Sequence, residues 1–102
     1  MENRLQIAGV VGNSPETRYS PAGIPIARFT LRHQSQQSEA GMQRQVLCNI
    51  GVVASGEALL QIVQQLQTGE GVRVIGFLAR ANNRQGENRL ILHADSIETI
   101  TI

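Results

Sequence analysis

The order of hydrophobic periods along the chain is its most restrictive feature. Apolar and polar residues alternate over residues 4–11, 45–52 and 72–78, which are the expected first, third and fourth strands. A run over residues 90–102, the expected fifth strand, ends in the alternating segment IETITI. A period of two places successive side chains on opposite faces and indicates half-buried strands. A further strand is expected around Phe29, Leu31 and His33, whose side chains share a face.

Between the third and fourth of these five strands the period changes. In residues 56–69, GEALLQIVQQLQTG, apolar residues recur at helical spacing, and Thr68 and Gly69 end the run. The order of three strands, one helix and two strands predicts an all-β chain with an OB-fold. This fold is a five-stranded Greek-key barrel, here with a short helix between strands 3 and 4. An SH3-like barrel is the alternative, but it usually lacks a helix of this length at that position.

The length of 102 residues suffices for one domain with a modest core, so we expect a single OB-fold domain over residues 1–102. The segments NSPE (13–16) and SPAGIP (20–25) interrupt the strands. Ile24 and Ile26 have the opposite parity to Phe29, and a bulge near residues 25–28 would reconcile them. Residues 34–41, QSQQSEAG, are polar and predict a flexible loop.

Several classes of function find no support in the sequence. No phosphate-binding loop, dinucleotide fingerprint, nucleophile elbow or HExxH motif occurs, and Cys48, His33 and His93 are too few and too scattered for a typical zinc site. We therefore predict a protein that is not an enzyme and has no cofactor or metal. Cys48 is expected to be a buried, inert thiol, because it lies on the apolar face of its strand. No segment approaches the length of a membrane span or has the pattern of a signal peptide, so we expect a cytoplasmic protein without a membrane partner.

The segment RANNRQGENRL, residues 80–90, is the first candidate for a binding site. The net charge of the whole chain is only +1, but its nine basic residues are all arginines, whose planar guanidinium groups suit phosphates and base faces. Three of them lie in this segment and are offset only by Glu87. On an OB-fold the segment is the loop between strands 4 and 5, one of the two loops that bind oligonucleotides or oligosaccharides. Arg18 and Arg44 would extend the basic track, although a solvated hairpin tip has the same polar character.

Aromatic platforms for stacking bases are scarce. The chain contains Tyr19, Phe29 and Phe77 and no tryptophan. Phe29 shares a face with Leu31 and is expected in the core. Phe77 lies opposite the inward valines of its strand, and base stacking, a subunit interface and capping of the barrel all remain open for it.

Five segments, taken in order, resemble a known family. They are NRLQIAGVV, YSPAGIPIARFTLRH, SEAGMQRQVLC, GVRVIGFLA and RLILHADSIE, and together they span nearly the whole chain. The sequence resembles the family of primosomal replication protein N, small OB-fold proteins of bacterial replication restart. The resemblance implies a homodimer that binds single-stranded DNA, contacts the primosomal helicase at abandoned forks and helps to bring in the next loading factor. It implies no catalysis.

The resemblance and the basic track together give the expected site. Arg18, Arg84 and Arg89 occupy basic positions of the family, and Met42 and Leu47 stand where aromatic residues can occur. The expected single-stranded-DNA-binding residues are Arg18, Met42, Arg44, Leu47, Arg84 and Arg89.

The chain departs from the family pattern at four places. Met42 and Leu47 lack a stacking plane, and Gln34 and Asn82 stand where a basic residue can occur. We therefore predict weaker and more electrostatic binding of single strands than in a relative that has those aromatics.

Two other functions fit the same fold. An OB-fold adaptor between proteins, with weak or no binding of nucleic acid, agrees with the near-neutral charge and the missing aromatics. An OB-fold protein for structured RNA could use the same arginines, and competition between single-stranded DNA and hairpin RNA would separate the two.

Overall fold

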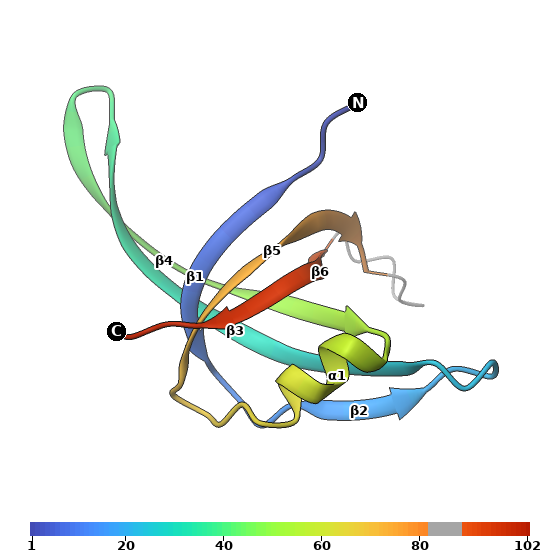
Figure 1. The fold of residues 1–102 in the computed structure, drawn as a ribbon. Coiled ribbons are helices and arrows are strands. Elements are labelled where there is room, and N and C mark those ends of the chain that lie inside the picture. Colours follow the sequence, from blue (N-terminus) through green and yellow to red (C-terminus); the bar gives the residue numbers. More distant parts are fainter. Residues whose placement is uncertain (82–88) are drawn as a thin grey trace.

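The computed structural model describes residues 1–81 and 89–102 and contains six strands and one short helix within them (Figure 1). In chain order the elements are β1 (Leu5–Val11), β2 (Glu16–Tyr19), β3 (Pro25–Glu39), β4 (Met42–Ser55), α1 (Glu57–Val63), β5 (Gly71–Arg80) and β6 (Leu90–Thr99).

Five of the strands close into a barrel. The strand order is β1-β5-β6-β4-β3, and a further pairing of β1 with β3 closes the ring, while β2 is attached to the outside edge of β3. The neighbouring strands are antiparallel except β4 and β6, which run parallel. Helix α1 connects β4 to β5, the third and fourth strands of the barrel. The prediction of a five-stranded OB barrel with a helix at this place is confirmed.

The core lies inside the barrel and under the helix. Alternate residues of each barrel strand point inward, as the sequence period predicted, and Leu60 and Val63 of α1 are buried against them. Phe29 is in the core, as expected. The buried apolar residues are Val11, Ala27, Phe29, Leu31, Val52, Ala54, Leu60, Val63, Leu66, Val72, Val74, Leu92 and Ile97.

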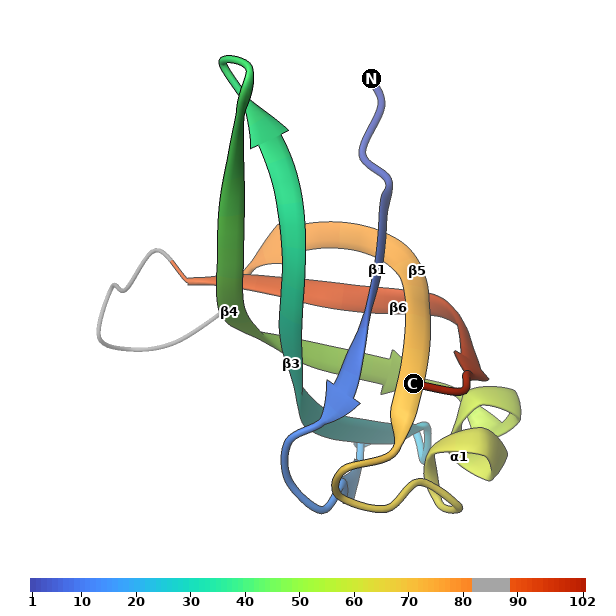
Figure 2. The same cartoon turned by 90° about the vertical axis from the view of Figure 1, so that its left-hand side faces the viewer.

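The prediction of a flexible loop over residues 34–41 is wrong. The β3–β4 ladder continues without a break from the pair Ile26 and Ser55 to the pair Glu39 and Met42. Ala40 and Gly41 form the two-residue turn, both with positive φ, as in the turns that suit the twist of a hairpin. The segment lacks a hydrophobic period because most of its residues are exposed on both faces, so alternation could not reveal it as a strand. We call residues 34–47 the arm, and it projects beyond the barrel (Figure 2).

The bulge also lies in a different place from the one predicted. The register of β3 is regular at residues 26–28, and Pro25, Ala27 and Phe29 are all buried on one parity. Ile24 precedes the strand and Ile26 is half-buried on the outside, so no change of parity is needed. The register shift occurs between β5 and β6 instead, where Gly76 pairs with Ala94 but Ile75 pairs with Ser96, which leaves Asp95 as the extra residue.

Two smaller differences concern residues 13–25 and the helix. Strand β2 was not predicted, because its four residues are all exposed and carry no hydrophobic period. The helix ends at Val63 rather than near Gly69, but tighter hydrogen bonds from Gln65 to Ile62 and from Leu66 to Val63 continue the turn and keep Leu66 in the core.

Within the described residues, α1 is the only helix, and it falls far short of the length that would carry a chain across a membrane.

Candidate nucleic-acid interface

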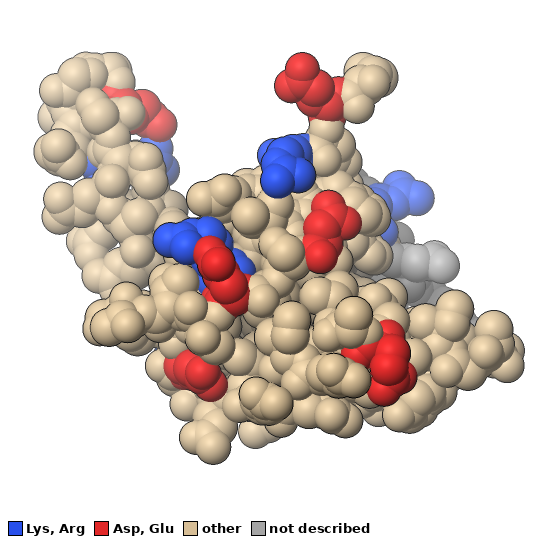
Figure 3. Space-filling view, in the orientation of Figure 1, with Lys and Arg blue, Asp and Glu red and all other residues tan. Residues whose placement is uncertain are grey.

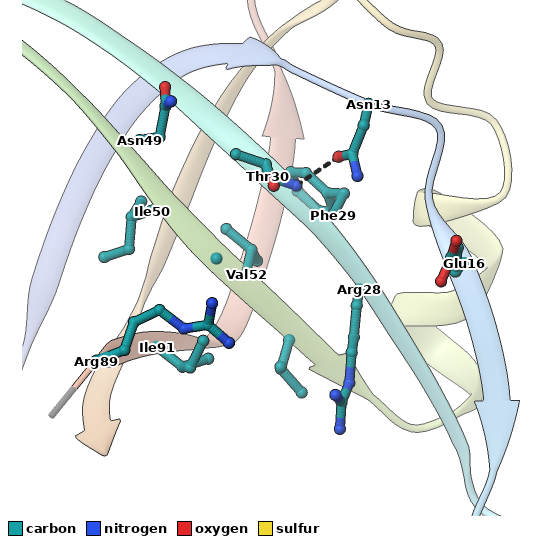
Figure 4. Close-up of a pocket in the computed structure, with 12 residues that line it drawn as sticks. Asn13, Glu16, Arg28, Phe29, Thr30, Asn49, Ile50, Val52, Arg89 and Ile91 are labelled. Carbon is teal, nitrogen blue, oxygen red and sulfur yellow. Dashed lines mark hydrogen bonds between the residues drawn. The ribbon is translucent and has the colours of Figure 1, made fainter. Parts of the chain in front are cut away.

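A groove of about 370 Å³ lies across β3, β4 and the start of β6 (Figure 4). The loop after β1 supplies one of its edges, and the segment that follows residue 88 supplies another. The residues that line it are Asn13, Glu16, Arg28, Phe29, Thr30, Asn49, Ile50, Gly51, Val52, Val53, Arg89 and Ile91.

The alternation of β3 and β4 decides which side chains face the groove. Because Phe29, Leu31 and Val52 point into the barrel, the residues between them point outward. Cross-strand partners share a face, so the outward residues form the rows Arg28 and Val53, Thr30 and Gly51, and Arg32 and Asn49. We call this side of the sheet the outer face. It corresponds to the face of strands 2 and 3 that OB-folds use for ligands.

Two arginines extend across the groove from opposite edges. Arg28 comes from β3 and Arg89 from the residue before β6, and both are exposed (Figure 4). Neither donates to a carboxylate of the described residues, in which the ion pairs are those of Arg44 and Arg73. Two guanidinium groups without a carboxylate partner among residues 1–81 and 89–102, above a partly apolar floor, provide cationic donors for phosphates and aliphatic surface for bases.

Polar groups fix the edge of the groove nearest to β1. The Asn13 side chain accepts a hydrogen bond of 2.7 Å from the backbone N–H of Thr30, which ties the loop after β1 to β3. Glu16 on β2 is paired with Arg28 in the strand register and places one carboxylate beside the groove. Arg28 and Arg89 are the basic residues that line the groove, and Glu16 is the acidic one.

The predicted site residues near the barrel agree with this geometry in part. Arg89 lines the groove. Arg18 is exposed on β2 and shares the outer face with Ile26 and Arg28, because Arg18 pairs with Ile26 and Glu16 with Arg28. Arg84, like Asn82, lies outside the described residues.

The three predicted residues of the arm do not share one face. Leu47 is 69% exposed and continues the outer face next to Asn49, where it also lines a neighbouring hollow at the base of the arm. Met42 and Arg44 have the opposite parity and point to the other side of the arm. Arg44 is paired with Glu39 at 3.0 Å, with both side chains mostly exposed, so its charge is partly compensated.

Sequence reasoning missed Arg28, Asn49 and the apolar floor around Ile91. The signal for Arg28 was present, because ARFTLR alternates arginine or threonine with buried residues and so places its polar residues on one outward face. The start of β6 could not be placed, because its parallel pairing with β4 brings Ile91 beside Gly51 across a long separation in sequence.

The expectation of a buried Cys48 is wrong. The residue has the inward parity of β4, but it lies where β3 and β4 leave the barrel, and its side chain is exposed. Its strand partner His33 is held by hydrogen bonds of 2.6 Å to the carbonyl oxygen of Ala8 and 2.7 Å to the hydroxyl of Ser35. These bonds give His33 a structural role that links β3 to β1.

Charge elsewhere on the surface is mixed. On the face shown in Figure 3, acidic and basic groups are interspersed and form no continuous patch of one sign among the described residues. Among the described residues, 1–81 and 89–102, no three His, Cys, Asp or Glu side chains are grouped so that they could hold a metal ion. The groove is therefore the feature of the described surface that combines unpaired cations with a concave, partly apolar floor.

Comparisons with known proteins agree on one kind of relative. A protein-family model with the description "Another single-strand binding protein family" matches residues 3–96 of this chain. Replication restart protein PriB of Photobacterium profundum is 45% identical over 100 residues, which cover 98% of this chain and 96% of that protein.

Two solved structures share the fold. The structure of priB from Ralstonia solanacearum has a TM-score of 0.81 and 30% identity, and the match covers 97% of this chain and 98% of that one. A Plasmodium falciparum SSB in complex with single-stranded DNA has a TM-score of 0.80 over 99% of this chain and 96% of that one. Its identity is 16%, so that likeness shows the fold alone.

Proposed function

The chain belongs to the family of replication restart protein PriB, and from this membership we propose that it binds single-stranded DNA as an accessory protein of the primosome in replication restart. The resemblance seen in the sequence is confirmed by the match to PriB proteins over nearly the whole chain.

The groove on the outer face is the proposed binding site for DNA, and its geometry is the main support for this function. It lies on the sheet face that OB-folds use for oligonucleotides, beside the loop after β1, and it presents Arg28 and Arg89 from opposite edges. A single strand that crosses β3, β4 and β6 would meet one guanidinium on each side of an apolar floor. Arg18, on the same face of β2, extends this path, and Arg84 completes the proposed basic set.

The arm contributes less stacking than an arm with aromatics would. Leu47 and Met42 are 69% and 72% exposed, so both are available to bases, but neither has a π-face. Stacking on an aromatic is worth about 1–3 kcal/mol per base, and aliphatic contact replaces only part of it. We therefore expect binding that depends strongly on phosphate contacts, with Arg44 adding a charge that Glu39 partly compensates.

The proposed oligomeric state and protein partners follow from the family resemblance. We propose that the protein acts as a homodimer, contacts the primosomal helicase and helps to bring in the next loading factor, without catalysis or a cofactor, in the cytoplasm. The single OB-fold domain over residues 1–102 is the unit that does so.

Anisotropy of a labelled oligothymidine strand, measured at 0.1 M salt, tests the DNA site. Arg28→Ala and Arg89→Ala should each weaken binding about fivefold, the counterion-release contribution of one phosphate contact to a single strand at that salt. Arg73→Ala is the matched control, because Arg73 is paired with Glu98 on β5 and does not line the groove. Equal losses in all three variants would show that only net charge matters, and a groove of this kind would then not be the site.

The same titration separates the alternatives. An adaptor between proteins would bind the labelled strand weakly or not at all at protein concentrations that keep the chain monodisperse. A protein for structured RNA would release the DNA strand when a hairpin RNA is added, whereas we expect single-stranded DNA to be the better competitor.

A further inference from the structure

Phe77 and His93 form a stacked pair on the outside of the barrel. Their ring centroids are 5.1 Å apart and the ring planes differ by 5°. His93 stacks on one face of the Phe77 ring, and Phe77 is 42% exposed although it belongs to a barrel strand, so we assign its exposed area to the ring face away from His93. An aromatic ring with one covered face and one open face is the arrangement on which a planar group can stack.

Gly76 brings the two rings together. A Cβ atom at this position would lie 1.9 Å from the carbonyl oxygen of His93, so only glycine allows β5 to approach β6 this closely. The register shift beside it changes the parity of β6, which turns His93 outward opposite Phe77 while Leu92 remains in the core. The pair is thus fixed by the backbone on both strands.

The strand registers place this pair on the same face as the groove. Arg28 pairs with Val53, Val53 with His93, and His93 with Phe77. Cross-strand partners share a face, so these four residues form one transverse row over β3, β4, β6 and β5, with neighbouring strands about 4.8 Å apart. Arg28 and Val53 line the groove, and the row continues from them to the stacked pair.

We propose that the face of Phe77 away from His93 is a stacking platform for one base of a bound single strand, on β5 and beyond the β6 edge of the groove. The proposal rests on the proposed function, because the strand is the ligand of the groove. His93 is a positioning residue that supports the ring from behind. The platform supplies on β5 an aromatic surface that Met42 and Leu47 do not supply on the arm.

The test uses Phe77→Leu, which keeps apolar bulk on the strand and removes the π-face. Anisotropy titrations compare an oligothymidine strand with an abasic deoxyribose phosphate strand of equal length, so that the two ligands differ only in their bases. We expect Phe77→Leu to weaken binding of the oligothymidine by about fivefold or more. Binding of the abasic strand and the slope of affinity against salt should stay as in the unsubstituted protein, because no charge is lost.

Tyr19→Leu is the matched control, since Tyr19 is an exposed aromatic on β2 whose parity places it on the other side from Arg18. Phe77→Trp, which keeps a stacking plane, should retain affinity. Unchanged binding by Phe77→Leu, an equal loss on the abasic strand, or an equal loss in Tyr19→Leu would each overturn the platform. A change of oligomeric mass without a change in affinity would likewise overturn it, because the ring would then belong to an interface between copies. Failure of the unsubstituted protein to bind either strand would instead contradict the proposed function.

Discussion

Strands β3 and β4 form one continuous ladder whose two halves behave differently. In the barrel half, the inward row contains Phe29 and Val52, which are 3% and 1% exposed. In the arm, positions of the same parity carry Gln37 and Arg44, which are exposed. The backbone pairing is the same in both halves, but only the barrel half has a core to pack against.

The difference shows what each half contributes. Burial of apolar side chains stabilises the barrel and fixes the register of β3 against β4. The arm continues the same register up to its two-residue turn, and most of its side chains are exposed. The arm therefore adds little to the free energy of unfolding, and it carries Met42 and Leu47 at the two positions where the family resemblance allows aromatic residues.

The largest expected effect comes from the same substitution in the two halves. Leu31→Ala removes a side chain that is fully buried and should lower the free energy of unfolding by about 2–5 kcal/mol. Leu47→Ala removes one that is 69% exposed and should change it by at most about 0.5 kcal/mol. Urea denaturation followed by circular dichroism measures both. Similar losses would show that the arm contains buried packing that the monomer does not reveal.

A comparison of two glycines tests the backbone of the barrel, at Gly76 in β5, against that of the arm, at Gly41 in its turn. Gly76→Ala places a Cβ against the backbone of His93 and should cost roughly 3 kcal/mol. Gly41→Ala meets no atom within 4 Å, but its φ of 76° is the left-handed region, and the cost should be about 1 kcal/mol. The melting temperatures of the two variants give the order, and a larger loss for Gly41→Ala would mean that the turn, not the barrel, limits stability.

Shortening the arm should affect DNA binding and leave the barrel intact. Replacement of residues 36–45 by Asn-Gly joins Ser35 and Val46, a pair of the same hydrogen-bonding type as the natural closing pair Glu39 and Met42, through a two-residue turn of the preferred type. The free energy of unfolding should change by less than about 1 kcal/mol. Affinity for oligothymidine at 0.1 M salt should fall by less than about fivefold, because the deletion removes Arg44 together with Glu39, which partly compensates its charge. A replacement of residues 36–45 that also unfolds the protein would contradict the independence of the two halves.

The sequence predicted the barrel well, because each barrel strand carries the period of a half-buried strand and the helix has a period of its own. It did not predict the arm, because residues 34–41 are paired by backbone hydrogen bonds and have no buried face to impose alternation. Cys48 has the same parity as the core residues of β4, but it is exposed because β4 leaves the barrel there and has no core to pack against.

The candidate site was predictable where it depends on local order and not where it depends on topology. Arg18 and Arg89 were predicted from the segments in which they lie, and Arg89 lines the groove. Arg28 could have been found from the alternation of its own strand. The alignment of Val53 with His93 and Phe77 required the parallel pairing of β4 with β6 and the register shift at Gly76, and neither has a local signature.

We expect phosphate contacts from arginines on the outer face to dominate the binding of single strands. This expectation is tested most directly by the affinity for oligothymidine measured across salt concentrations. With about four phosphates neutralised, log K should fall with log salt at a slope near −3, and Arg89→Ala should make that slope shallower by about 0.7. A flat profile in the unsubstituted protein, or an unchanged slope in Arg89→Ala, would contradict the account.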